Sequence, residues 1–312
     1  MATYLLRRAA VSVLTLIVLM VLAFALPRMI RGDTATALLG LHATEADRER
    51  LRQRYALDDP LPVQFTRWAG QIIRGDLGAT RTGQPVTAAM GRALPVTLLL
   101  SAGALLFGLL AGLPLGAAAA KRPGGWLDHL CSGAGLLGLS VPGFWLGTLL
   151  ILLFSLKLGW LPPGAGYEFT RSPLSRLSVL VLPLIALGAA VAAVIMRMTR
   201  SALLEVWRED YIRTARAKGA PPRRVLLKHA LRNAAVPIVT ILGMQVGYLL
   251  GGAVVIEELF SLPGIGRLML HAVLARDYPL IQGVILLVGT LFIAVNLAVD
   301  LAYGGLDPRI RL

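Results

Sequence analysis

Long runs without a charged residue dominate the pattern of apolar and polar positions along the chain. Six of them are long enough to cross a bilayer, which takes about 20 residues, and they cover residues 9–26, 93–120, 130–156, 177–196, 234–256 and 278–299. The runs do not alternate between apolar and polar residues, as strands of a membrane barrel do. Because a helix satisfies its own backbone hydrogen bonds in lipid, the pattern predicts an all-α integral membrane protein with six transmembrane helices.

Composition agrees with this prediction. Only 15% of the 312 residues are charged and the mean hydropathy is +0.70, whereas soluble domains carry roughly 25% charged residues. Neighbouring helices satisfy the carbonyls that a proline frees, so we expect the helices to accommodate Pro95, Pro114, Pro142, Pro183 and Pro237. Cys131 is the single cysteine, which excludes an internal disulfide and a multi-cysteine metal site. No metal site is expected.

The distribution of Lys and Arg predicts the orientation. With six spans both termini share one side, and that side collects 16 basic residues, ten of them between Arg197 and Arg232. The two short loops on the other side hold five. Cytoplasmic loops carry the excess of positive charge, so both termini and the 197–232 loop of this multi-pass membrane protein are expected in the cytoplasm.

These expectations divide the chain. Residues 1–30 hold the N-terminal tail and first helix, 31–92 an extracytoplasmic segment, 93–303 a five-helix core with a cytoplasmic loop at 197–233, and 304–312 a C-terminal tail. The start also resembles a signal peptide, with Arg7-Arg8, an apolar run and Ala23-Phe24-Ala25. The run is longer than a typical signal core, which favours a retained helix.

The extracytoplasmic segment contains two predicted helices. Residues 45–55 form a charged pattern, and residues 63–73 are amphipathic, with Phe65, Trp68 and Ile72 on one face. Such a face suits the lipid headgroups, with Trp68 as an interfacial anchor; it equally suits an external partner protein.

The cytoplasmic loop carries a distinct pattern. Residues 201–218 predict a helix with an apolar stripe of Leu204, Trp207, Tyr211 and Ala215, and with Glu209 placed to pair with Arg213. Gly219 supplies a left-handed stop, and Pro221-Pro222 suit the first turn of a second helix. That second helix turns Val225, Leu226, Ala230 and Leu231 inward. The result is a basic helix-turn-helix elbow.

Three interpretations fit an elbow of this kind. A basic loop next to spans binds anionic lipid at about 1 kcal/mol per Lys or Arg, but such a loop needs no pair of helices around a rigid turn. A DNA-binding helix-turn-helix has no other support in the chain, so nucleic acid is not an expected partner. A docking surface for a cytoplasmic protein uses both the charge and the turn.

The elbow resembles the signature loop of ABC importer permeases, whose pattern is Glu-Ala-Ala, three residues, Gly, nine residues, then Ile-x-Leu-Pro. Arg213-Thr214-Ala215, Gly219 and His229-Ala230-Leu231-Arg232 occupy these places. Arg213 and Arg232 depart from the general pattern but are the forms of the peptide-permease branch. Residues 57–64, 74–78, 144–147, 158–164, 258–266 and 306–309 are similar to the same branch. The whole chain thus resembles the first membrane subunit of a dipeptide or oligopeptide importer.

This resemblance implies a type I ABC importer permease fold and a location in the bacterial inner (plasma) membrane. It also implies a set of partners: a related second permease, two cytoplasmic ATPase subunits or domains, and an extracytoplasmic peptide-binding protein. The elbow would then be the coupling helix. Its implied coupling residues are Arg213, Thr214, Ala215, Lys218, Gly219, Ala220, Pro221, Arg223, Arg224, Leu227, His229, Leu231 and Arg232. The chain has no G-x-x-x-x-G-K-[ST] phosphate loop, so it is not expected to be an enzyme, and ATP and Mg²⁺ would bind the partner subunits.

Polar residues near the spans are further candidates. Asp300 is expected to form a structural ion pair with Arg197 or Arg200. Gln245 and Asn296 lie deep in spans, where interhelical hydrogen bonds are the common role; Glu257 and Glu258 lie at the outer mouth, either solvated or facing a peptide amino terminus. We take these four as candidates for the pathway or gate.

Three rival functions remain at this point. Nickel and glutathione importers share the motifs. A secondary transporter would need interrupted helices with buried charges, and the spans are nearly free of charge. An intramembrane enzyme would need catalytic residues that the spans lack.

Overall fold

The computed structural model describes residues 2–29, 44–46, 49–50, 58–165 and 173–306; the predicted helix at 45–55 therefore lies largely outside the described residues. The described part forms helices and turns, with one isolated β-bridge between Ala79 and Pro85. The elements are α1 (Ala2–Ala25), η1 (Leu26–Met29), α4 (Leu61–Ile73), α5 (Val86–Lys121), α6 (Trp126–Ser140), α7 (Gly143–Leu150), the π-helix η2 (Ile151–Lys157), α9 (Pro173–Val206), α10 (Asp210–Ala217), α11 (Pro222–Arg224), the π-helix η3 (Val225–Ala230), α12 (Leu231–Leu259), α13 (Ile265–Ala275) and α14 (Tyr278–Leu306).

Five of the described helices are long and apolar enough to cross a membrane: α1, α5, α9, α12 and α14. The sixth predicted span, residues 130–156, is not one straight helix. It is bent by 102° between α6 and the α7–η2 segment. Val141 is extended, with φ −80° and ψ 120°, and Pro142 precedes the first residue of α7. The residue before a proline avoids the helical region, and Gly143 lowers helix propensity further. The break corrects the sequence prediction.

Several helices extend beyond the uncharged runs that predicted them. Helix α5 begins at Val86, within the segment expected outside the membrane, and contains Pro95 and Pro114 without a break. Helix α9 continues through Arg197 and Arg200 to Val206, so the loop expected at 197–233 begins inside a helix.

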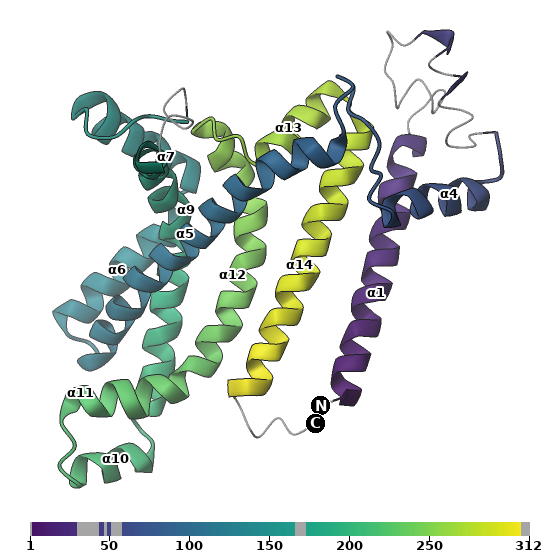
Figure 1. Ribbon diagram of the computed structural model, residues 1–312. Helices are drawn as coiled ribbons and strands as arrows, with labels where there is room; N and C mark the ends of the chain where they lie inside the picture. The colour runs from purple at the N-terminus through teal and green to yellow at the C-terminus, as the bar shows by residue number, and fades with distance from the viewer. Residues whose placement is uncertain (1, 30–43, 47–48, 51–57, 166–172, 307–312) are drawn as a thin grey trace. The chain divides into compact units, whose positions relative to one another are not determined.

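The chain forms two compact units, and the boundaries between them fall within α5, in the turn between α12 and α13, and within α14. In the unit of residues 98–262 and 295–311, α9 packs beside α12 and α6, and α10 and α11 join the ends of α9 and α12 (Figure 1). Gly108, Gly112 and Gly116 of α5 face α9 at four-residue spacing. A Cβ at Gly112 would lie 2.7 Å from the carbonyl oxygen of Ala192. Small residues at this spacing let two membrane helices approach closely.

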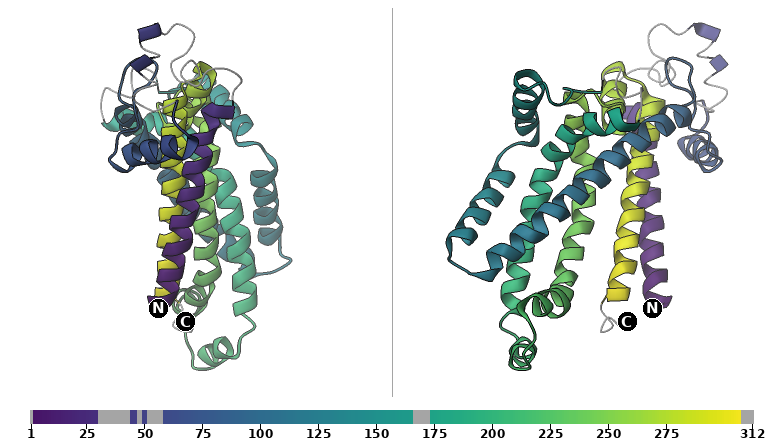
Figure 2. Two further views of the ribbon diagram at one scale, coloured as in Figure 1. Left: turned by 90° about the vertical axis from the view of Figure 1, so that its right-hand side faces the viewer. Right: turned by 60° about the vertical axis from the view of Figure 1, so that its left-hand side comes forward.

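In the unit of residues 1–97 and 263–294, α1 runs beside α14 (Figure 2). The amphipathic helix predicted at 63–73 is present as α4, and its apolar face packs on the end of α1: Trp68 is buried, with its ring centroid 5.6 Å from that of Phe24. Phe65 and Ile72 join the same cluster. The structure therefore corrects the expectation of a Trp68 anchored in headgroups, because this face is used inside the chain.

Candidate coupling elbow

In the structure the elbow begins later than the sequence predicted, because α9 extends to Val206. The name is used from here on for residues 207–230, which form a turn, α10, a second turn, α11 and η3. The helix predicted at 201–218 is divided: α9 ends at Val206, and Glu209 is extended, with φ −69° and ψ 142°, before α10 begins at Asp210. This break also changes the predicted apolar stripe. Ile212 is fully buried, whereas Tyr211 is exposed and its hydroxyl oxygen accepts a hydrogen bond from the Asn233 amide nitrogen at 2.7 Å.

Gly219 has the left-handed conformation that the sequence predicts, with φ +76°. Its N–H donates to the carbonyl oxygen of Arg216 at 2.9 Å, and the N–H of Ala220 donates to that of Ala215 at 3.2 Å. Such bonds close the C-terminus of a helix, and glycine adopts this φ without steric cost. Pro221 and Pro222 then precede and open α11, as predicted.

One hydrophobic cluster ties the elbow to three long helices. Its buried members are Ile212, Val225 and Ala230 from the elbow, Ala202 and Leu203 from α9, Ala234 and Ile238 from α12, and Ala120 from α5. Leu226 and Leu231 are partly buried against it, so the inward face predicted for the second helix is confirmed. Because close-packed interiors transmit strain, this cluster links the elbow mechanically to these helix ends.

The opposite side of the elbow is exposed and basic. Arg213, Lys218, Arg223 and Arg224 are all exposed. The predicted pair of Glu209 with Arg213 is not formed: Arg213 lies 3.3 Å from Asp210 instead. Glu209 is the extended residue that precedes the first turn of α10, so its side chain does not lie on the helix surface one turn before Arg213, as the prediction assumed.

The structure places the remaining coupling candidates on both sides of the elbow. The Thr214 hydroxyl donates to the carbonyl oxygen of Asp210 at 3.0 Å, and Leu227 is exposed. The carbonyl oxygen of His229 accepts from the Asn233 amide at 3.1 Å. Ala215, Ala220 and Leu231 pack against the cluster, and the side chain of Arg232 lies outside the described residues.

A buried ion pair next to the elbow was not predicted. Arg200 of α9 donates from Nε to Asp128 Oδ1 at 2.6 Å and from Nη2 to Asp128 Oδ2 at 2.8 Å. The N–H of Gly124 donates to Asp128 Oδ2 at 2.9 Å. This corrects the expectation for Arg200 as the partner of Asp300, whereas the pairing of Arg197 with Asp300 stays a prediction. The uncharged run predicted the third span only from residue 130, whereas α6 begins at Trp126, includes Asp128 and packs on α9. An acidic residue four positions after Gly124 was the available signal.

The candidates for the pathway or gate are not brought together as one described site. Gln245 is buried in α12 and Asn296 is half-buried in α14. Glu257 is fully buried, which excludes the solvated alternative for this residue, and Glu258 beside it is half-buried. Their part in transport remains a prediction.

Comparison with known proteins identifies the family. Residues 112–312 match the model for the inner membrane component of binding-protein-dependent transport systems, and residues 1–101 match the model for the N-terminal part of such components. The chain is 38% identical to the oligopeptide transport system permease protein AppB of Bacillus subtilis, over 100% of both chains. It is 42% identical to the di/tripeptide transport system permease protein DppB of Pseudomonas aeruginosa and 40% identical to the glutathione transport system permease protein GsiC of Pectobacterium atrosepticum, in each case over 100% of this chain and 99% of the relative.

The fold has a counterpart among solved structures. A chain of the MetNI methionine ABC transporter, in a structure of its inward-facing conformations, aligns with a TM-score of 0.58 at 21% identity, over 70% of this chain and 96% of that one. At this identity the likeness concerns the fold, and it confirms the predicted importer-permease architecture. Together with the family matches, it establishes that the chain belongs to the inner membrane components of binding-protein-dependent transport systems, the permease subunits of ABC importers.

Proposed function

We propose that the chain is the membrane-spanning permease subunit of an ATP-driven importer of dipeptides or oligopeptides, and that it forms half of a heterodimeric translocation pathway. Full-length relatives named for peptide transport support the substrate class. Its relative named for glutathione transport is also 40% identical, and glutathione is itself a tripeptide. The proposal includes cytoplasmic termini, on the distribution of Lys and Arg.

The elbow is the part that couples transport to ATP hydrolysis. The observation that carries this proposal is the hydrophobic cluster in which Ile212, Val225 and Ala230 pack against the ends of α5, α9 and α12. An ATPase bound to the exposed basic side would move the elbow, and the cluster would pass that movement to the helices as a rigid-body shift between discrete arrangements.

The partners follow from this role. Two cytoplasmic ATPase subunits or domains bind ATP and Mg²⁺, a second related permease completes the pathway, and an external binding protein delivers the peptide. This chain binds no cofactor of its own in the proposal, since the nucleotide is hydrolysed on the partners.

The first test is co-purification from native membranes in mild detergent. We expect an ATPase to accompany the chain, to be lost when residues 213–227 are replaced by a neutral flexible linker, and to be weakened in the double variant Arg223→Gln/Arg224→Gln. A matched charge change at Lys157, an exposed residue at the end of η2, should leave the ATPase bound. Recovery of the second permease with no ATPase would refute the coupling role.

The turn itself is tested by Gly219→Pro. Proline fixes φ near −65° and has no N–H, so it is incompatible with φ +76° and with the bond to Arg216. We expect normal membrane insertion and loss of most peptide uptake in reconstituted vesicles. Gly75→Pro is the matched control, because Gly75 has φ +81° and its N–H donates to Ile72 in the same way. Equal loss of uptake in both variants would show general damage rather than a coupling role.

Substrate class is tested by competition. Uptake of a labelled dipeptide is measured against unlabelled dipeptide, longer peptides, glutathione and Ni²⁺, with the cognate binding protein present. We expect peptides to compete and Ni²⁺ not to; competition by Ni²⁺ alone would overturn the proposed substrate while leaving the coupling role intact.

A further inference from the structure

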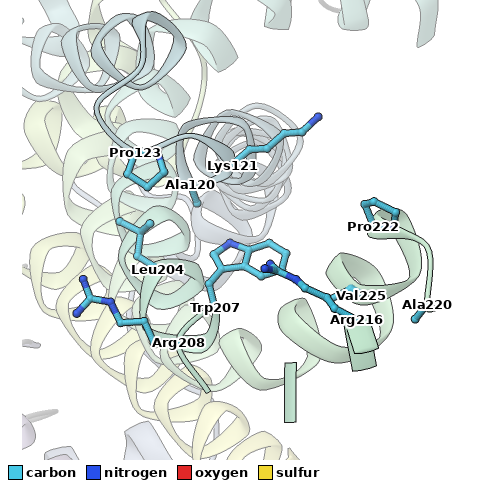
Figure 3. A pocket seen from close by; sticks show the side chains of 10 residues that line it. All are labelled: Ala120, Lys121, Pro123, Leu204, Trp207, Arg208, Arg216, Ala220, Pro222 and Val225. Atoms are coloured by element: carbon cyan, nitrogen blue, oxygen red, sulfur yellow. The ribbon is translucent and has the colours of Figure 1, made fainter. Parts of the chain in front are cut away.

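A pocket at the base of the elbow contains none of the exposed basic residues of the proposed coupling surface, Arg213, Lys218, Arg223 and Arg224; of the coupling residues implied by the sequence it contains only Ala220. It has a volume of about 460 Å³ and is lined by Ala120, Lys121, Pro123, Leu204, Trp207, Arg208, Arg216, Ala220, Pro222 and Val225 (Figure 3). This volume lies in the range of small-molecule sites, about 300–1,000 Å³. Three of the lining residues are basic and none is acidic, so the pocket favours an anionic occupant.

The cations of this pocket are free to bind. The guanidinium of Arg216 lies 4.8 Å from the ring centre of Trp207 (Figure 3). Stacking of this kind uses the flat face of the guanidinium and leaves its edge N–H groups available. Within the described part of the chain, neither the Arg216 guanidinium nor the Lys121 ammonium has a hydrogen-bond or ion-pair partner.

The pocket lies at the ends of helices long enough to span a membrane, which is the level at which lipid headgroups are expected. It lies where α5 ends at Lys121 and α9 ends at Val206, and α6 begins beside it at Trp126, whose side chain is 73% exposed. Tryptophan is enriched at this level of a membrane protein. Leu204 and Val225 give the pocket an apolar wall next to its cations, a combination that suits an amphiphile better than a free ion.

We propose that this pocket binds the phosphate headgroup of an anionic phospholipid, held between Lys121 and Arg216, with the glycerol against the apolar wall. The lipid would then support the base of the elbow, on the side away from the exposed Arg223 and Arg224. The proposal goes beyond the coupling role and holds without it.

The test is binding of phosphatidylglycerol to the purified full-length chain in neutral detergent, followed by native mass spectrometry. Phosphatidylcholine with the same acyl chains and the soluble headgroup glycerophosphoglycerol serve as comparison ligands. We expect Lys121→Gln and Arg216→Gln each to weaken phosphatidylglycerol binding about fivefold, since each basic residue near the surface contributes about 1 kcal/mol. Arg122→Gln is the matched control, because Arg122 is exposed at the same end but does not line the pocket.

A second pair of variants tests the aromatic ring of Trp207, on which the Arg216 guanidinium stacks. The buried indole N–H of Trp207 has no hydrogen-bond partner in the described residues, so Trp207→Phe removes no such bond and keeps an aromatic face for Arg216. We expect Trp207→Phe to bind nearly as wild type and Trp207→Leu to bind several-fold more weakly.

Several outcomes would overturn the lipid site. Equal affinity for phosphatidylcholine would remove the headgroup selectivity. An equal loss in Arg122→Gln would reduce the effect to general surface charge, and tight binding of the soluble headgroup alone would point to a free phosphate ester. If addition of the ATPase displaces the lipid from this pocket, the surface belongs to the protein interface instead.

Discussion

Asp128 and Asp210 each pair with an arginine in the same unit of the molecule, but their surroundings differ. The Asp128 side chain is 5% exposed and accepts two hydrogen bonds from Arg200, which is 31% exposed. The Asp210 side chain is 93% exposed and lies at a single distance of 3.3 Å from Arg213, which is 75% exposed. The first pair joins α6 to α9, whereas the second lies on the outer side of the elbow.

This difference separates charges that hold the fold from charges available to a partner. Both oxygens of the buried Asp128 carboxylate already accept hydrogen bonds within the chain. Removal of either Asp128 or Arg200 would leave the charge of the other without a partner. An exposed pair is screened by water and contributes little to stability. The elbow can therefore exchange its internal pair for contacts with an ATPase at small cost.

The largest effect is expected for Asp128→Ala. It leaves Arg200 without its carboxylate and the Gly124 N–H without its acceptor. Because Arg200 keeps some access to water, we expect a loss of about 2–3 kcal/mol in unfolding free energy, below the range for a fully buried pair. Unfolding of the purified chain in detergent by a denaturant measures it. The double variant Asp128→Leu/Arg200→Met should recover at least half of the loss; a double variant as unstable as Asp128→Ala would contradict the uncompensated-charge explanation.

An intermediate effect is expected for Asp277→Ala, in the other unit. Asp277 Oδ2 accepts from the backbone N–H of Arg81 at 2.8 Å, and Oδ1 accepts from that of Leu280 at 3.3 Å. The side chain of Arg81 in turn donates to the carbonyl oxygen of Ala275. Loss of a helix cap and a buried acceptor should lower the unfolding free energy by about 1–2 kcal/mol.

Asp277→Asn is the control for this prediction. Its amide oxygen replaces one of the two acceptors, so we expect it to lose about half as much stability as Asp277→Ala. Equal unfolding free energies for wild type and Asp277→Ala would show that the hydrogen bond from the Arg81 N–H to Asp277 contributes nothing to stability.

Sequence predicted the features that depend on local geometry. The length of the uncharged runs predicted the long helices, and Gly219 with Pro221 and Pro222 predicted the turn. The helical spacing of the apolar residues between 63 and 73 predicted the apolar face of α4. These depend on the backbone and on neighbours a few residues away.

Sequence missed the features that depend on which helices meet. Arg197 or Arg200 was expected to pair with Asp300 because all three lie at a similar depth. Depth does not specify which helix a side chain faces, and Arg200 of α9 pairs with Asp128 of α6. The bend at Pro142 was missed for a different reason. Pro95, Pro114, Pro183 and Pro237 are flanked by aliphatic residues and stay within helices, whereas Pro142 has Gly143 directly after it and Ser140 two residues before it, and both lower helix propensity. Judging prolines one at a time overlooked these neighbours.

The smallest effect on stability, and the sharpest test of the comparison, is expected for Asp210→Ala. Both members of its pair are mostly exposed, so removing the carboxylate should change the unfolding free energy by less than about 0.5 kcal/mol. The same substitution raises the net positive charge of the elbow and frees Arg213, so affinity for an ATPase with an acidic docking site should rise, and more strongly at low salt. Unfolding in detergent and ATPase binding at two salt concentrations measure the two quantities. A stability loss as large as that of Asp128→Ala would contradict the distinction, because an exposed charge would then be holding the fold.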